Sequence, residues 1–107
     1  MKFIFEIKLK KGHAQKQYID AWKKGSAIIQ KSGGAQGTTL YQNRDDPTSL
    51  LAIATWKSKK ERDAALKRLH SARLKIQEVI ISHRKYGEID ILGNFEEIAA
   101  VKPDRKK

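Results

Sequence analysis

Several residue types that build common kinds of functional site are missing or scarce in this chain of 107 residues. It contains no cysteine, which excludes disulfide bridges, thiolate metal sites and cysteine catalysis. No apolar run approaches the roughly 18 residues that a membrane span needs. Glu6 and Lys8 also interrupt the apolar N-terminal stretch that a signal peptide would require. The sequence therefore predicts a cytoplasmic protein without a membrane partner.

Acidic residues are outnumbered, with 12 Asp and Glu against 23 Lys and Arg, for a formal net charge of +11. Such a balance can indicate an anionic partner such as nucleic acid. It can equally indicate a lysine-rich surface that keeps a small protein in solution. The basic residues are spread along the whole chain, which favours the second interpretation. The densest basic run, from Lys57 to Lys75, is the best candidate for an anion-facing surface.

Four apolar segments are typical of β-strands. Alternation with a period of two predicts a strand over residues 2–10 with one buried face. Residues 35–43 and 49–57 read as two strands of a hairpin, because turn-forming Asn, Asp and Pro lie between them. The second of these is apolar on both faces and is expected to be the most buried. The last strand covers Ile89–Val101, with a bulge near Gly93-Asn94.

Two other segments have the spacing of amphipathic helices. Apolar residues three and four apart form one stripe over residues 13–31 and another from Ser58 to about residue 81. Ser58 and Glu61 have the spacing of a capping box at the start of the second helix.

The resulting order is β-α-β-β-α-β, which predicts an α+β, ferredoxin-like fold with one antiparallel sheet and both helices on one face. We expect a single domain over residues 1–102 and a frayed basic tail over residues 103–107. The other face of the sheet would carry Leu40, Leu51 and Ile53. An apolar face of this kind suggests that a second sheet packs on it.

The apolar strand that ends in Trp56 resembles a segment of the antibiotic biosynthesis monooxygenase family. An Asp46-Pro47 turn precedes it and Ser58 opens a helix after it, as in that family. The stretch Gly37-Thr-Thr-Leu-Tyr41 is similar to the family's second strand. The resemblance implies a ferredoxin-like subunit that pairs through its sheet into a dimeric α+β barrel. It also implies a cofactor-independent monooxygenase of quinols or other aromatic molecules.

Haem-degrading members of that family carry an Asn, a Trp and a His at positions that fall near Ile7 and at Ala65 and Lys75 here. None of these residues matches, so haem degradation is not expected. The resemblance to the cofactor-independent members implies that no flavin, nicotinamide or other cofactor is bound. Quinol-oxygenating members place a Tyr near the position of Arg62, and only Trp56 carries over from them.

Four residues are candidates for binding a substrate. Trp56 could stack on an aromatic substrate at the mouth of a cavity between sheet and helices, or it could anchor the core at a strand end. Trp22 lies on the first helical stripe, where a core role is typical. Phe5 on the first strand and Arg62 in the second helix complete the set.

Tyr41 and His83 are the catalytic candidates, because a phenol can position a substrate hydroxyl and an imidazole can transfer a proton near neutral pH. His83 could equally interact with the last carbonyls of its helix. No set of histidines and carboxylates has the spacing of metal ligands, so no metal site is expected.

Three functions stay open from the sequence. The first is a small-molecule monooxygenase that acts on a quinol or another reduced aromatic substrate. The second is a non-catalytic homodimer that binds a hydrophobic ligand or a partner. The third is a nucleic-acid binder that uses the basic second helix. It is the least favoured, because the third strand lacks the aromatic and glycine pattern of RNA-recognition domains.

Overall fold

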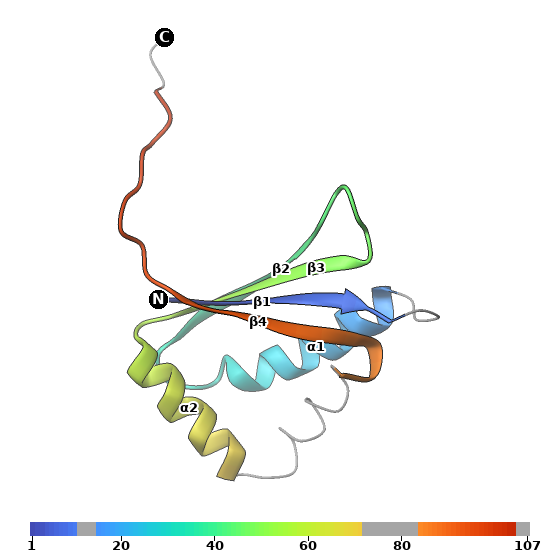
Figure 1. Ribbon diagram of the computed structural model, residues 1–107. Coiled ribbons are helices and arrows are strands. Elements are labelled where there is room, and N and C mark those ends of the chain that lie inside the picture. The colour runs from blue at the N-terminus through green and yellow to red at the C-terminus, as the bar shows by residue number, and fades with distance from the viewer. Residues whose placement is uncertain (11–14, 72–83, 105–107) are drawn as a thin grey trace.

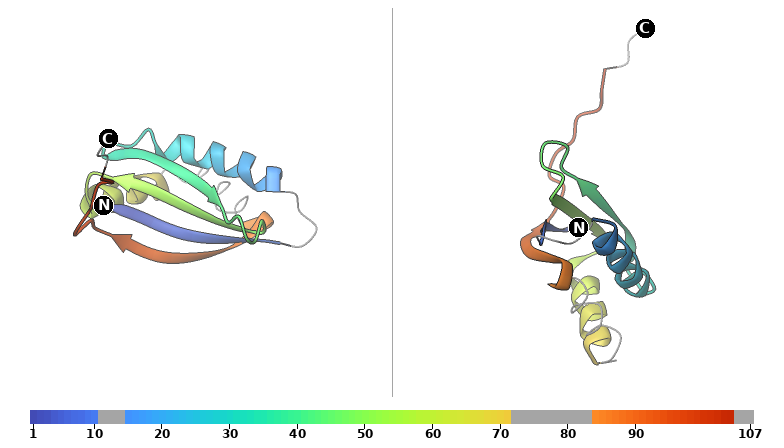
Figure 2. Two further views of the ribbon diagram at one scale, coloured as in Figure 1. Left: turned by 90° about the horizontal axis from the view of Figure 1, so that it is seen from above. Right: turned by 90° about the vertical axis from the view of Figure 1, so that its right-hand side faces the viewer.

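The strands of the protein form one antiparallel sheet, and both described helices lie on the same side of it (Figures 1 and 2). The structure, a computed structural model, describes residues 1–10, 15–71 and 84–104. Its elements in chain order are β1 (Lys2–Leu9), α1 (Gln15–Ile29), β2 (Ala35–Gln42), β3 (Ser49–Trp56), α2 (Lys59–Ser71) and β4 (Gly87–Phe95). The predicted β-α-β-β-α-β order and α+β, ferredoxin-like class are confirmed.

The core lies between the helices and the two central strands. The sheet order is β2-β3-β1-β4, so β1 and β3 are each paired on both sides. Ile7 of β1 lies opposite Leu50 of β3 and Ile89 of β4. Ile7 and Leu50 form a buried cluster with Ala52 and with Tyr18 of α1. As predicted, β3 is heavily buried, which follows from its two covered edges and its apolar side chains.

The register of β2 against β3 decides which face each β2 side chain occupies. It shifts between Ala35 and Thr38, after which Leu40 lies opposite Ala52. Since Ala52 faces the helices, Leu40 does so too, and it packs against the buried cluster. The prediction that Leu40 lies on the other face with Leu51 was therefore wrong. A shift of one residue exchanges the faces of a strand, and the sequence does not show it.

Helix α1 ends close to the predicted residue, and α2 begins directly after Ser58, as predicted. Ser58 caps α2, because its Oγ accepts a hydrogen bond from the backbone N–H of Glu61 at 3.1 Å. The predicted continuation of this helix to residue 81 lies outside the described residues. In the described part of the chain, no helix has the length and apolar character needed to cross a membrane.

The predicted bulge in the last strand is confirmed. Ile4 pairs with Gly93 while the next residue, Phe5, pairs with Ile91, so that Leu92 is left without a partner residue on β1. Gly93 has a φ of +135°, in a region that a residue with a Cβ rarely adopts. Glycine at this position therefore allows β4 to bend.

β4 is shorter than predicted. Its last pair joins Phe95 to Lys2, where β1 begins, and residues 96–104 form neither strand nor helix. The prediction that the strand continues to Val101 was wrong, because the chain there has run past the strand with which it pairs. Figure 1 shows this segment leading away from the sheet. Its two large apolar side chains, Ile98 and Val101, are 97% and 96% exposed.

Candidate functional site

The helix-facing side of β1 carries a pair of aromatic rings beneath a guanidinium group. Phe3 and Phe5 are two residues apart, so their side chains leave the strand on the same side. Their ring centroids are 5.8 Å apart and their planes are tilted by 45°. The guanidinium carbon of Arg62, from α2, lies 4.6 Å from the centroid of Phe3. A cation at this distance is attracted to the negative face of the ring.

Arg62 is held in this place by its neighbour in sequence. Its Nη2 and Nε lie 2.9 Å and 3.1 Å from Oδ1 of Asp63, and its side chain is only 13% exposed. Lys59 donates to the other oxygen of Asp63 at 2.8 Å. The Lys59 ammonium, followed by the Arg62 guanidinium, holds the pKa of Asp63 below its usual value. The carboxylate therefore stays ionised and keeps the guanidinium oriented.

Both tryptophans lie on the same side of the sheet as Phe5. Trp56 shares the helix-facing positions of β3 with Leu50, and it is 2% exposed. Trp22 of α1 is partly buried and packs against the core cluster. The burial of Trp56 fits a core anchor better than an open stacking platform. Together with Arg62, the four predicted substrate-binding residues thus lie on one side of the sheet.

The two predicted catalytic residues do not join this group in the described structure. Tyr41 lies opposite Leu51, on the face of the sheet away from the helices, and it is 51% exposed. It therefore lies on the other side of the sheet from Arg62. His83 falls outside the described residues, so its role stays a prediction from the sequence.

Tyr41 borders a pocket of about 270 Å³ on the open face of the sheet. The open-face positions of β1, β2 and β3 and of the turn supply most of its lining, with Glu6, Asn43, Ser49 and Leu51 beside Tyr41. The pocket thus combines a ring, an aliphatic side chain and a carboxylate at the turn end of the β2–β3 hairpin.

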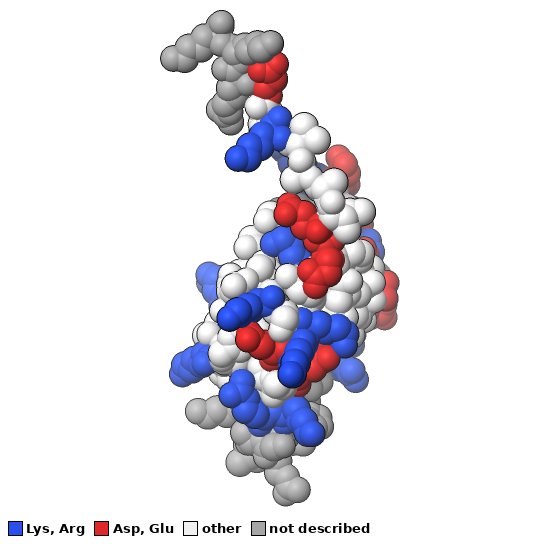
Figure 3. All heavy atoms as spheres, turned by 90° about the vertical axis from the view of Figure 1, so that its left-hand side faces the viewer, with Lys and Arg blue, Asp and Glu red and all other residues white. Residues whose placement is uncertain are grey.

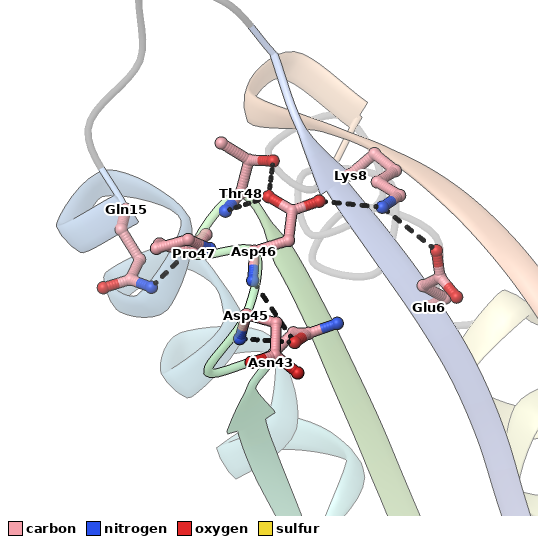
Figure 4. Close-up of polar contacts among 8 residues, drawn as sticks. All are labelled: Glu6, Lys8, Gln15, Asn43, Asp45, Asp46, Pro47 and Thr48. Atoms are coloured by element: carbon pink, nitrogen blue, oxygen red, sulfur yellow. Dashed lines mark hydrogen bonds and ion pairs between the residues drawn. The ribbon is translucent and has the colours of Figure 1, made fainter.

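A network of polar contacts ties this turn to β1 (Figure 4). Oδ1 of Asp46 accepts hydrogen bonds from Oγ1 and N of Thr48, at 2.6 Å and 3.1 Å. Its Oδ2 accepts one from Nζ of Lys8 at 3.3 Å, and that ammonium also lies 3.7 Å from Glu6. Asn43 Oδ1 accepts from the N–H of Asp46 at 3.3 Å. The bonds from Thr48, and then that from Lys8, lower the pKa of Asp46.

The side chain of Glu61 has an environment that the capping motif in the sequence does not predict. Its carboxylate lies against Gly34, close enough that a Cβ on residue 34 would clash with it. Oε2 of Glu61 is buried without a hydrogen-bond partner among the described residues. The spacing from Ser58 gave a sequence signal for the cap, but the contact with Gly34 depends on tertiary structure.

Nowhere in residues 1–10, 15–71 and 84–104 do three or more His, Asp or Glu residues gather to hold a metal ion.

Comparison with known families identifies the chain. The model of the family described as antibiotic biosynthesis monooxygenase matches residues 1–75. The protein belongs to the antibiotic biosynthesis monooxygenase family. The matched part includes β1, both strands of the hairpin, α1 and α2, and therefore every residue of the aromatic and guanidinium group. The resemblance seen in the sequence is thus confirmed at the level of the family.

Solved structures of other proteins share the fold. The cofactor-independent oxygenase SnoaB from Streptomyces nogalater is 17% identical with a TM-score of 0.69, over 92% of this chain and 96% of its own. A protein from Bordetella bronchiseptica assigned to the same family is 11% identical with a TM-score of 0.71, over 91% and 96%. A conserved protein from Methanosarcina mazei Go1 is 17% identical with a TM-score of 0.65, over 88% and 91%. No curated protein sequence matches the chain.

Proposed function

We propose that this protein is a cofactor-independent monooxygenase of a quinol or another hydroxylated aromatic molecule, bound on the helix-facing side of the sheet. The substrate hydroxyl loses its proton, and the anion passes one electron to O2. The substrate radical and superoxide then join in a C–O bond. Loss of water from the resulting peroxide leaves a new carbonyl. One oxygen atom enters the product, the other leaves as water, and the substrate supplies all four electrons.

The arrangement of Arg62 over Phe3 is the observation that carries this proposal. Both the substrate anion and superoxide are negatively charged, and a fixed guanidinium stabilises such charge as it develops. Arginine keeps its charge at any physiological pH. The low exposure of Arg62 makes its charge more effective than it would be in water, and Asp63 already orients it. Phe3 and Phe5 add an apolar wall against which an aromatic ring can pack.

The reaction also needs a base that accepts the proton of the substrate hydroxyl. We propose Glu61 as a candidate beside His83, because its buried Oε2 has no hydrogen-bond partner among the described residues. Glu61 precedes Arg62 on α2, which brings a proton acceptor and a cation to the same end of that helix. Tyr41, on the opposite face, would act only in a site on that face.

Oxygen consumption with a panel of quinols, naphthols and anthrones tests the proposal directly. Arg62→Gln removes the guanidinium and should lower kcat by roughly a hundredfold, as loss of one preorganised charge-stabilising donor does. Arg44→Gln removes the same charge from an exposed turn and serves as the control. Equal activity of the three proteins would remove Arg62 from the mechanism. If aromatic compounds bind but none consumes oxygen, the protein is a ligand-binding member of the family.

We further propose that the protein forms a homodimer through the open face of the sheet. That face carries Leu51, Ile53 and half-exposed Tyr41. Burying their apolar surface against a second copy would contribute favourable free energy to dimerisation. Ile98 and Val101 lie on a segment with almost no contact to its own subunit. A second copy offers both of these surfaces a complementary apolar partner.

A further inference from the structure

The outer face of α2 presents a row of positive charge. Over residues 59–69, the exposed positions of this helix follow one another at intervals of one and three residues, so they share one side of it. They are Lys59, Lys60, Asp63, Ala64, Lys67 and Arg68. The opposite side turns Ala65, which is 0% exposed, and the partly buried Leu66 and Leu69 toward the protein. The face is therefore four cations, one carboxylate and one methyl group.

The one carboxylate on this face is already engaged. Asp63 is paired with Lys59 and with Arg62, at 2.8 Å and 2.9 Å. No ion pair joins Lys60 or Arg68 to another residue in the described ranges. Lys57, at the end of β3, adds a further exposed cation beside the start of the helix. Figure 3 shows Lys and Arg gathered around a smaller group of carboxylates on the lower half of one face.

The residue types on this face favour one class of anionic partner over the others. A helix that inserts into a membrane surface needs large apolar side chains on the inserted side, and this face has only Ala64. Binding of single-stranded nucleic acid relies on aromatic rings that stack on bases, and residues 59–69 of α2 expose none. A nucleic-acid duplex presents regularly spaced phosphates along its length. A row of lysines and arginines can bind them without large apolar or aromatic side chains.

We infer that the outer face of α2 binds the phosphate backbone of duplex nucleic acid without reading its sequence. The helix runs obliquely away from the sheet (Figure 1), and the six positions of this face are exposed. The contact does not require the proposed monooxygenase reaction, because Lys60, Lys67 and Arg68 lie on the opposite side of α2 from its apolar, core-facing residues. With a net charge of three to four on the face, about three to four phosphates are neutralised.

Fluorescence anisotropy of a labelled duplex of arbitrary sequence measures this binding. Release of counterions should make the affinity fall roughly 40- to 150-fold between 50 and 200 mM salt, for about three to four phosphates. The variant Lys60→Gln/Lys67→Gln/Arg68→Gln should lose most of the affinity at 50 mM salt. The matched control Lys16→Gln/Lys23→Gln/Lys24→Gln removes three exposed cations from α1 and should retain most of it. Circular dichroism checks that both variants keep the fold.

Four outcomes overturn the inference. The first is an absence of duplex binding at 50 mM salt. The second is an equal loss of affinity in both triple variants, which would assign binding to net charge. The third is tighter binding of a single strand than of the duplex. The fourth is binding of vesicles with anionic lipid while the duplex stays free.

Discussion

Lys8 of β1 and Asp46 of the β2–β3 turn are joined by a hydrogen bond of 3.3 Å between Nζ and Oδ2. The bond crosses from the edge of the hairpin to a central strand, 38 residues away in sequence. With the two bonds that Thr48 donates to the same carboxylate, it holds the turn next to the pocket on the open face.

Asp46→Asn should therefore lower the midpoint of urea unfolding at pH 7, because the amide cannot replace the charged acceptor. The pKa of Asp46 is lowered in the folded state, so its stabilising effect is complete above the unfolded value of about 3.9 and disappears as the pH falls below it. The two unfolding curves should converge between about pH 4 and pH 2. Asp45→Asn changes the same charge within the same turn and serves as the control. A constant difference between the curves across this range would contradict the assignment.

Gly34→Ala should destabilise the protein by about 1–3 kcal/mol, since residue 34 has a φ of +88°. The added Cβ also meets the carboxylate of Glu61. A second change, Glu61→Ala, should recover part of the loss, but the backbone penalty should remain. Gly33→Ala is the matched control, because no atom lies within 4 Å of its added Cβ. Chemical denaturation of the wild type, Gly34→Ala, Glu61→Ala and the double variant gives the coupling free energy between the two residues. Additive effects would show that they do not interact.

The buried phenol of Tyr18 should make the free energy of unfolding fall at alkaline pH. Burial raises the pKa of this phenol, whose side chain is 0% exposed. A group whose pKa is higher in the folded state stabilises it fully below the unfolded pKa, about 10 for tyrosine, and less as the pH rises above that value. Between pH 10 and pH 11.5, the stability of the wild type should therefore fall more steeply than that of Tyr18→Phe. Parallel curves in denaturant titrations would exclude this contribution.

The proposed dimer predicts the effect of a charge placed on the open face. Leu51→Glu should convert a dimer to a folded monomer in sedimentation velocity, because the carboxylate would be buried without a partner in the interface. Ala27→Glu adds the same charge at an exposed position of α1 and should leave the dimer intact. A wild type that sediments as a monomer at all concentrations would reject the proposed interface.

The order of elements was predictable from the sequence because it depends on local properties. A period of two in β1 and spacings of three and four in α1 are set by backbone geometry. The cap at Ser58 and the bulge at Gly93 follow from what individual residue types allow their own backbone to do. These features involve residues that are close in the chain, and they were confirmed.

Relationships between distant segments depended on the tertiary structure. The face that Leu40 and Tyr41 occupy follows from a shift in the pairing of β2 with β3. The end of β4 follows from the place where β1 begins. The contact of Arg62 with Phe3 joins residues 59 positions apart (62 − 3) and depends on the direction in which α2 leaves the sheet. The sequence by itself determined the elements and the family. Only the folded chain decided which side chains meet, because strand register and helix placement are set by packing across the whole domain.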